Sequence, residues 1–305
     1  MTAPAVLATG LCLQAAGRPI VDAVSFSVAA GEIFGIVGAD GAGKSALLRL
    51  LTGQQRPSAG TLALFGRPAG DPQVRERLAY MPQVFGQYPD LSVRENLRFY
   101  AALHGLRGAA ASAMVADLTA RAGLRGFEQR RAGQLSGGMM QKLALACALV
   151  TRPRAIFLDE PTTGVDPVSR RAFWQLLEGV RAEGVAIVCA TANMEEAERC
   201  DRIAMMRRGR FRHIGTALEL IASVRSHLYL AAGAQGRALV PLLRARPEVE
   251  LAFPVGRQAR VWLPAGAAIA ALQAAIPDVQ FTPLAPGLHD VALRDLALQQ
   301  EGGDA

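Results

Sequence analysis

The segment from Gly38 to Ser45 has residue types and a spacing suited to binding phosphate groups. It reads Gly-Ala-Asp-Gly-Ala-Gly-Lys-Ser and matches the pattern G-x-x-x-x-G-K-[ST] between a predicted strand and a predicted helix. Glycines let backbone N–H groups approach phosphate oxygens, and the helix N-terminus adds partial positive charge. We expect Lys44 to reach the β- and γ-phosphates of a nucleotide and the Ser45 hydroxyl to bind Mg²⁺. The predicted nucleotide-binding residues of this phosphate loop are Gly38, Ala39, Asp40, Gly41, Ala42, Gly43, Lys44 and Ser45.

The alternative for this segment is a glycine-rich turn that happens to contain a lysine. The chain has 33 basic residues, and only Lys44 and Lys142 are lysines. A lysine in the position that the phosphate pattern requires, within a chain that otherwise uses arginine, disfavours a chance match.

A pair of acids forms a second candidate element. Asp159 and Glu160 follow directly after the apolar run Ala155–Leu158. An acid at the C-terminal end of a buried strand lies where α/β sheets bind their ligands. We therefore expect Asp159 to hold Mg²⁺ through water and Glu160 to polarise the attacking water as general base. An isolated Asp-Glu pair would be read as a solvated turn, but the apolar run and the phosphate loop favour catalysis.

The elements that position these residues alternate between short apolar runs and helical stretches. This alternation predicts an α/β fold with a parallel sheet. The predicted buried strands are Glu32–Val37, Ala155–Leu158 and Val185–Ala190, and the predicted helices are Ser45–Leu51, Leu143–Val150 and Arg170–Arg181.

The composition changes near residue 215, which predicts a second, smaller domain. We place the boundary between a first domain, 1–220, and an α+β domain, 221–305. The pattern after residue 221 has the order βαββαβ of a ferredoxin-like module, followed by a last helix. Its strands are predicted at Leu228–Ala231, Val249–Phe253, Ala259–Leu263 and Val279–Pro283, and its helices at Ala238–Arg246, Ala267–Ile276 and Leu288–Ala297.

Composition and charge exclude several protein classes. Of the 305 residues, 51% are hydrophobic, which excludes wholesale disorder, and no apolar run reaches the roughly 18 residues that span a bilayer. We see no secretory signal, and the four cysteines fit neither a paired metal site nor a disulfide framework, so a cytosolic chain is expected. The net charge of +7 lies wholly in residues 1–224, but no nucleic-acid motif accompanies it and only 6% of residues are aromatic. No nucleic-acid partner is predicted.

The segment Leu135–Gln141, between the two phosphate-site elements, points to a family. It reads Leu-Ser-Gly-Gly-Met-Met-Gln and, together with the phosphate loop, resembles the signature of the ATP-binding cassette (ABC) family. Tyr80–Gln83 is similar to the Q-loop of that family, and Pro161–Pro167 is similar to its D-loop. The resemblance covers about residues 7–215. It implies a P-loop NTPase ABC ATPase domain with a helical subdomain at about 84–150.

The resemblance also implies how the site is completed. Gln83 would sense the γ-phosphate and contact Mg²⁺ together with Ser45 and Asp159. Ser136, Gly137 and Gly138 would form a second anion cradle. This cradle would close on ATP held by the phosphate loop of another cassette, in a homo- or heterodimer that ATP binding assembles and hydrolysis releases.

Flanking stretches are similar to ATPase subunits of drug-resistance and polymer exporters. They are Tyr88–Leu106, the segment around the signature, Asp159–Trp174 and, more weakly, Pro286–Leu293. The resemblance implies ATP hydrolysis that powers export through a separate membrane-spanning permease, which residues 84–96 would contact. For Tyr88 and its apolar neighbours, core packing is an equal alternative. The expected location is cytoplasmic, peripheral on the cytoplasmic face of the cell membrane.

Two positions depart from the family pattern. Ala15 aligns with an aromatic residue that stacks on adenine in the family, and Ala192 aligns with the switch histidine. We therefore expect slow turnover, unless the neighbouring Asn193 supplies a substitute hydrogen bond. Two alternatives stay open: a weakly hydrolysing regulatory subunit paired with a complete cassette, and a soluble nucleic-acid ABC ATPase. The second is disfavoured because the chain holds one cassette and no long coiled-coil insertion.

Overall fold

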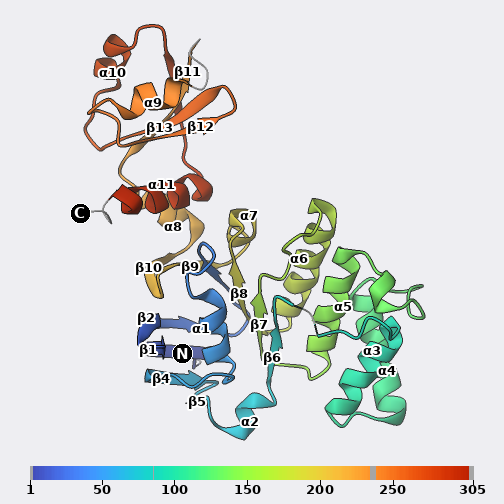
Figure 1. The fold of residues 1–305 in the computed structure, drawn as a ribbon. Coiled ribbons are helices and arrows are strands. Elements are labelled where there is room, and N and C mark those ends of the chain that lie inside the picture. The colour runs from blue at the N-terminus through green and yellow to red at the C-terminus, as the bar shows by residue number, and fades with distance from the viewer. Residues whose placement is uncertain (1–2, 85, 234–237, 302–305) are drawn as a thin grey trace. The chain divides into compact units, whose positions relative to one another are not determined.

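The computed structural model describes residues 3–84, 86–233 and 238–301 (Figure 1). The chain divides into two compact units that meet between Ile214 and Gly215, whereas the sequence places the boundary after residue 220. Helix α8 (Ala217–Ala222) explains the difference, because it packs against the last helix of the second unit. Its N-terminus is closed by a capping box between Thr216 and Glu219.

A six-stranded sheet forms the centre of the first unit. In spatial order its strands are β10 (Arg210–Gly215), β9 (Arg202–Arg207), β3 (Ile33–Val37), β8 (Ala186–Thr191), β7 (Ala155–Asp159) and β6 (Leu78–Met81). The five strands from β9 to β6 run parallel. All residues of β3, β7 and β8 are buried, as expected for strands covered on both faces. The predicted parallel sheet is confirmed.

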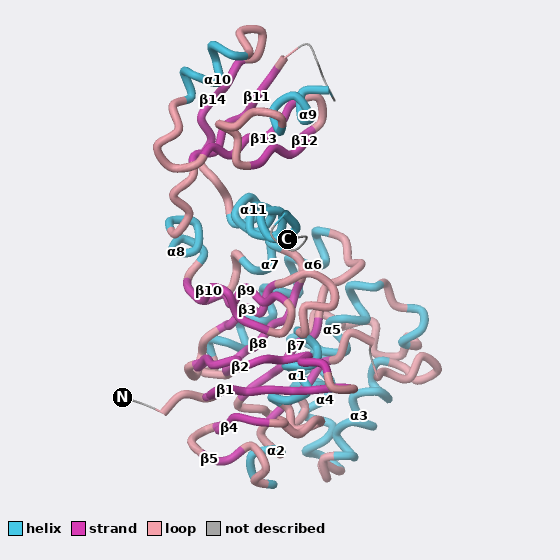
Figure 2. The backbone as a smooth tube through the Cα atoms, turned by 60° about the vertical axis from the view of Figure 1, so that its left-hand side comes forward, coloured by secondary structure: helices cyan, strands magenta, loops and turns pink. Residues whose placement is uncertain are grey.

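A second, antiparallel sheet packs on this centre and was not predicted from the sequence. Its order is β2 (Arg18–Val28), β1 (Val6–Ala15), β4 (Ala59–Leu64) and β5 (Arg67–Pro68). Helix α1 (Lys44–Leu51) shares one hydrophobic core with both sheets, through Leu47 and Leu48. Figure 2 shows the strands of both sheets with α1 among them. The first residue of α1 is thereby fixed at the end of β3.

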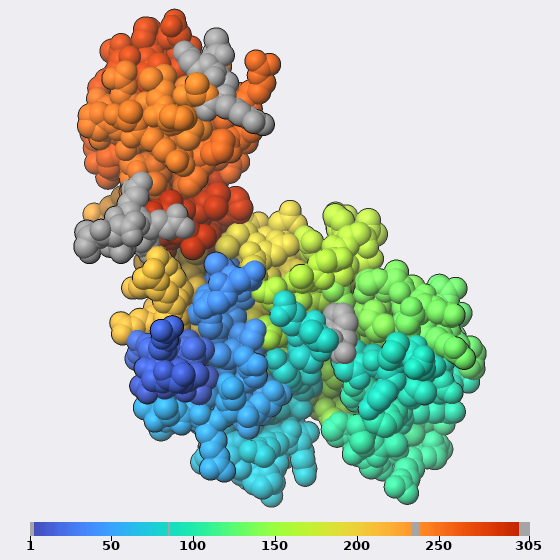
Figure 3. Space-filling view, viewed as in Figure 1, coloured from blue at the N-terminus to red at the C-terminus, as the bar shows by residue number. Residues whose placement is uncertain are grey.

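The remaining helices of the first unit lie mostly in one region. That region contains α3 (Val93–Leu103), α4 (Gly108–Arg121), a 3₁₀ turn (Ala132–Gln134) and α5 (Gly137–Leu149). In the space-filling view its teal and green residues form a distinct lobe of this unit (Figure 3). The other helices are α2 (Pro72–Arg75), α6 (Pro167–Ala182) and α7 (Met194–Ala197).

The second unit has the predicted ferredoxin-like topology. Its elements are β11 (His227–Ala232), α9 (Leu239–Arg244), β12 (Leu251–Val255), β13 (Gln258–Leu263), α10 (Ile269–Ala275), β14 (Gln280–Leu284) and α11 (Leu288–Glu301). The strand order β12-β13-β11-β14 is antiparallel throughout and is that of a βαββαβ module. Val261 packs with residues of α9 and α10, while Trp262 packs with residues of α11, so helices cover both faces of the sheet. No helix within the described ranges of the chain has the length and apolarity needed to cross a membrane.

Candidate functional site

The phosphate loop joins the end of β3 to the start of α1, as predicted. Gly41 and Gly43 have φ angles of 76° and 106°, which residues with a side chain rarely adopt. At Gly38 an added Cβ would lie 2.2 Å from the carbonyl oxygen of Met206, and at Gly43 it would lie 2.7 Å from that of Ile20. The glycines are therefore required both by the conformation of the loop and by the backbone packed behind it.

The turn between β9 and β10 supports this loop. The turn is formed by Arg208 and Gly209. The N–H group of Gly209 donates to the carbonyl of Ala42 at 2.8 Å, and its own carbonyl accepts from the N–H group of Asp22 at 2.8 Å. Arg210 forms an ion pair with Asp22 at 2.6 Å. Through the turn, Ala42 of the phosphate loop is thus linked to β2 and to the start of β10.

Lys44 points back along the loop. Its amine donates to the carbonyl oxygens of Gly38 at 2.7 Å and Ala39 at 3.2 Å, and it lies 3.1 Å from Oε1 of Glu160. The side chain is 5% exposed. A buried cation held by carbonyls and one carboxylate can exchange these partners for phosphate oxygens without moving its backbone.

Asp159 links the loop to the end of β7. Its Oδ1 accepts a hydrogen bond from Ser45 Oγ at 3.0 Å, and its Oδ2 accepts one from the Tyr80 hydroxyl at 3.2 Å. Burial raises the pKa of Asp159, although the Ser45 and Tyr80 hydrogen bonds oppose the shift. Burial, and then the negative charge of Asp159, raise the pKa of Tyr80 to about 12. The sequence did not indicate this role of Tyr80, because only the structure aligns β6 beside β7.

The oxygen atoms around Asp159 fit a magnesium ion. Mg²⁺ prefers hard oxygen ligands and is usually bound by one or two protein groups together with phosphate and water. Ser45 and Asp159 provide a hydroxyl and a desolvated carboxylate side by side. Among the described residues, no cluster of three or more His, Cys, Asp or Glu side chains could hold a metal ion.

Glu160 occupies a strained position next to Asp159. Its φ angle of 47° lies in the left-handed region, which costs of order 1–3 kcal/mol for a residue other than glycine. Its N–H group donates to the carbonyl of Ala190 at 2.8 Å, and its Oε2 accepts from Thr163 Oγ1 at 3.0 Å. This backbone directs the carboxylate toward Lys44.

The signature segment lies at the start of α5. Ser136 is exposed and caps the helix, since its Oγ accepts from the N–H group of Met139 at 3.3 Å. Gly137 is open, with nothing within 4 Å of an added Cβ, whereas at Gly138 that atom would lie 2.3 Å from Cβ of Ser169 on α6. The absence of a side chain at Gly138 thus allows α5 and α6 to pack closely. Within the described part of the chain, no hydrogen bond or ion pair joins Ser136 or Gly137 to the phosphate loop.

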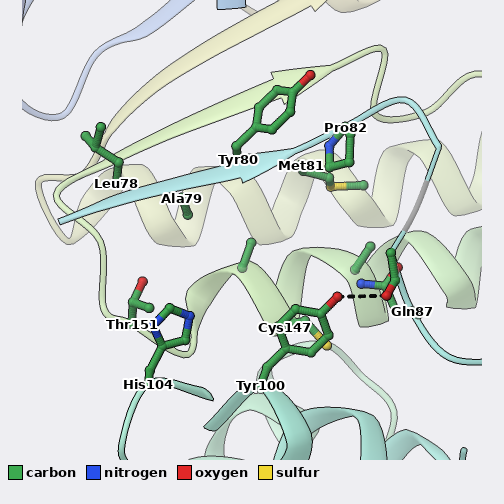
Figure 4. A pocket seen from close by; sticks show the side chains of 13 residues that line it. Leu78, Ala79, Tyr80, Met81, Pro82, Gln87, Tyr100, His104, Cys147 and Thr151 are labelled. Carbon is green, nitrogen blue, oxygen red and sulfur yellow. Dashed lines mark hydrogen bonds between the residues drawn. The ribbon is translucent and has the colours of Figure 1, made fainter. Parts of the chain in front are cut away.

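Gln83 lies two residues after β6, with an exposed side chain. Its segment borders a cavity of about 240 Å³ between β6, α3 and α5. In Figure 4, Tyr100 and Cys147 lie on the side of this cavity opposite β6, while the ring of Tyr80 points away from it. Tyr100 donates to the carbonyl of Gly86 at 2.8 Å. Tyr88, predicted as either a contact or a core residue, is 46% exposed and packs edge-on against Phe99.

The two departures from the family pattern are both at exposed alanines. Ala15 ends β1 and pairs with Arg18 of β2. Ala192 lies just after β8 and presents only a methyl group. Asn193 caps α7, because its Oδ1 accepts from the N–H group of Glu195 at 2.9 Å; its amide nitrogen keeps two hydrogens to donate.

The fold and this loop define a P-loop nucleotide-binding domain with a helical insertion, which is the class seen in ABC ATPases. The family described as ABC transporter matches residues 21–163. The chain is 42% identical over 209 residues to the Nod factor export ATP-binding protein I of Paraburkholderia xenovorans (strain LB400), covering 68% of this chain and 69% of that protein. It is 38% identical over 250 residues to the probable multidrug ABC transporter ATP-binding protein YbhF of Escherichia coli (strain K12), covering 81% of this chain but 43% of that protein.

Solved structures agree with the sequence relatives. An ATP-binding subunit of an ABC transporter superposes with a TM-score of 0.64 at 27% identity, covering 72% of this chain and 92% of that chain. The cbiO1 protein of Clostridium perfringens, part of the ABC transporter complex cbiONQ, gives 0.67 at 25% identity, covering 72% and 91%. The chain belongs to the ABC transporter family of ATP-binding proteins. It spans 43% to 64% of the length of the first multidrug and Nod factor relatives.

Proposed function

We propose that this chain is the ATP-binding and ATP-hydrolysing subunit of an exporter and acts on a separate membrane-spanning permease. The observation that carries the proposal is the joining of Lys44, Ser45, Asp159 and Glu160 at one sheet edge by contacts of 3.0–3.1 Å. Holding these groups in one place in advance lowers the entropic cost of bringing a phosphate and the attacking water together. Relatives named for multidrug transport and Nod factor export support the exporter assignment.

Each residue of the site has a proposed role in hydrolysis. The loop amides and Lys44 hold the β- and γ-phosphates, with the lysine leaving its carbonyl partners for phosphate oxygens. Ser45 and Asp159 would hold Mg²⁺, which would neutralise charge on the phosphates, and Gln83 would contact the same ion. Glu160 accepts a proton from the attacking water. Its strained backbone supports this role, because strain persists where the surroundings over-determine a conformation.

A second copy of the cassette, or a related one, is proposed to complete the site. Ser136 and Gly137 present an exposed helix N-terminus with no contact to their own phosphate loop among the described residues. A helix start is suited to anions. The segment thus fits ATP carried by a partner cassette, as the family resemblance implies. Gly138 contributes through close packing that fixes the start of α5.

The permease is proposed to dock at the segment after Gln83. Val84 is 83% exposed, and the adjacent cavity is lined by apolar side chains of β6 and α5. A partner docked here would contact residues that follow the strand bearing Tyr80, and hence the site. The chain would then lie on the cytoplasmic face of the cell membrane without spanning it.

A weakly hydrolysing regulatory subunit is the second candidate. The exposed methyl group of Ala192 favours it, since that group offers no hydrogen bond to a γ-phosphate. Such a chain would bind ATP at Lys44 and rely on a partner cassette for most turnover.

The test is phosphate release by the purified full chain with ATP, with and without Mg²⁺. We expect release that needs Mg²⁺ and rises more steeply than linearly with protein concentration, because two cassettes form each site. ATP binding with turnover only after a second, complete cassette is added would favour the regulatory candidate. A chain that does not bind ATP would overturn both.

A further inference from the structure

A buried carboxylate on α7 is not used by the hydrolysis described above. Glu196 is 2% exposed, and charged side chains are almost never this buried unless they are paired. Its Oε1 accepts a hydrogen bond from the hydroxyl of Thr162, and Arg170 Nε of α6 lies 3.8 Å from the same oxygen. The residue therefore contacts two separate segments of the chain.

The first of these segments follows Glu160. Thr162 is two residues beyond Glu160, is itself 1% exposed, and has its hydroxyl directed at Glu196. Glu160 keeps its left-handed backbone between the Ala190 hydrogen bond on one side and Thr162 on the other. Releasing Thr162 would remove one of the contacts that hold this segment in place.

A further segment, which joins β8 to α7, carries Ala192 and Asn193. The N–H group of Glu196 donates to the carbonyl of Asn193 at 3.2 Å, and the Thr191 side chain opposes the rise in the pKa of Glu196 that burial causes. Thr191 Oγ1 accepts from the N–H group of Asn193 at 3.0 Å, and the Thr191 carbonyl accepts from Gly38 of the phosphate loop at 3.4 Å. Glu196 is thus tied to the residues on either side of Ala192.

Arg170 closes the cluster from α6. Besides its approach to Glu196, it donates to the Val165 carbonyl at 3.3 Å and to Glu195 Oε2 at 3.1 Å. The guanidinium therefore joins the segment after Glu160 to α7 at three points.

From this geometry we infer that Glu196 is a positioning residue, which holds the Glu160 segment and the Ala192–Asn193 segment in register through Thr162, Thr191 and Arg170. This inference rests on the proposed ATP hydrolysis. The methyl group of Ala192 cannot donate a hydrogen bond to a phosphate. The inference therefore assigns part of the alignment of the two segments to the buried carboxylate of Glu196.

The variant Thr162→Val tests the inference, because it keeps the shape of the side chain and removes the hydroxyl. We expect single-turnover hydrolysis at saturating ATP to fall by about 10- to 100-fold, since small misplacements of catalytic groups cost this much. The ATP dissociation constant should stay within about two-fold, because the phosphate loop is untouched. Amide hydrogen exchange should rise in residues 160–163 and 191–194. Thr162→Ser, which restores a hydroxyl, should recover both the rate and the protection.

Thr119→Val is the matched control. Thr119 is also 2% exposed, and its hydroxyl donates to the Val115 carbonyl within α4. The Thr119→Val variant should leave the hydrolysis rate and the amide hydrogen exchange of both segments at parental values. Parental turnover and exchange in Thr162→Val would overturn the inference, as would a loss of rate matched by a loss of ATP binding, or a failure of Thr162→Ser to recover. If the parent itself does not hydrolyse ATP, the proposed function fails, and the exchange of the two segments alone decides the inference.

Discussion

The two ends of the proposed ATP site differ in how they are held within one chain. At the phosphate loop, Lys44 and Asp159 are buried, and hydrogen bonds join β2, β3, β6, β7 and the β9–β10 turn around them. At the signature segment, Ser136 and Gly137 are exposed, and Ser136 Oγ caps α5 by accepting from the N–H group of Met139. The first end is preorganised by its own chain, whereas the second lies at a surface. We therefore expect substitutions at the phosphate-loop end to affect ATP binding and hydrolysis within one copy of the chain. Substitutions at the signature end should affect the association of two cassettes.

Glu160→Gln should have the largest effect and acts at the preorganised end. The amide keeps the shape but cannot accept a proton, so hydrolysis should fall by about 10²–10⁴-fold, and an ATP-bound dimer should accumulate. Single-turnover assays measure the loss of hydrolysis. Size-exclusion chromatography with light scattering measures the fraction of dimer. Glu178→Gln on α6 is the control. A variant with parental turnover would show that the base lies elsewhere.

Lys44→Ala should weaken ATP binding by about 10²–10³-fold. The expected loss corresponds to about 3–4 kcal/mol, which is in the range for removing one partner of a buried charge pair. Equilibrium binding of a fluorescent ATP analogue measures it. Lys142→Ala, the other lysine of the chain, should bind as the parent does, and equal binding by both variants would contradict the phosphate-loop assignment.

Ala192→His should raise single-turnover hydrolysis by up to about 100-fold, because one preorganised donor to a developing negative charge is worth that much or more. ATP affinity should change little. Asn193→Ala, measured beside it, separates the alternatives. If histidine gives no gain and Asn193→Ala loses activity, Asn193 performs the switch role and the site is competent as it stands.

Two adjacent glycines test the exposed end. Gly138→Ala should lower the free energy of unfolding by about 1–3 kcal/mol, because its Cβ would collide with Ser169. Gly137→Ala should melt as the parent does, since that position is open. Thermal denaturation of both variants checks the contrast, and equal melting temperatures would mean that α5 and α6 are not in close contact at Gly138.

Tyr80→Phe should produce the smallest change. Loss of one hydrogen bond to Asp159 costs about 1 kcal/mol, so the Mg²⁺ concentration needed for half-maximal ATP binding should rise several-fold. Tyr100→Phe removes a hydroxyl that donates to the Gly86 carbonyl and serves as control. An unchanged Mg²⁺ requirement in Tyr80→Phe would show that Asp159 is oriented by Ser45 alone.

The sequence predicts the parts of the molecule in which local pattern and chemistry coincide. The phosphate loop, the three buried strands and the ferredoxin-like order of the second unit all follow from short apolar runs and glycine positions. The antiparallel sheet does not, since register shifts and the positive φ of Gly10 break the alternation in β1. The contacts of Tyr80 and Glu196 could not be predicted either, because they join residues 79 and 34 positions apart.

The strand order also bears on how the protein is made. Strand β3, which leads into the phosphate loop, pairs with β8 on one side and β9 on the other, and these strands end at Thr191 and Arg207. During synthesis from the N-terminus, both edges of β3 therefore stay unpaired while residues 38–185, nearly half of the chain, are translated. Pairing over such sequence separations is slow, and unpaired edges favour aggregation. The phosphate loop is consequently among the last parts of the first unit to take shape, and a chain interrupted before residue 186 would present β3 with neither neighbour.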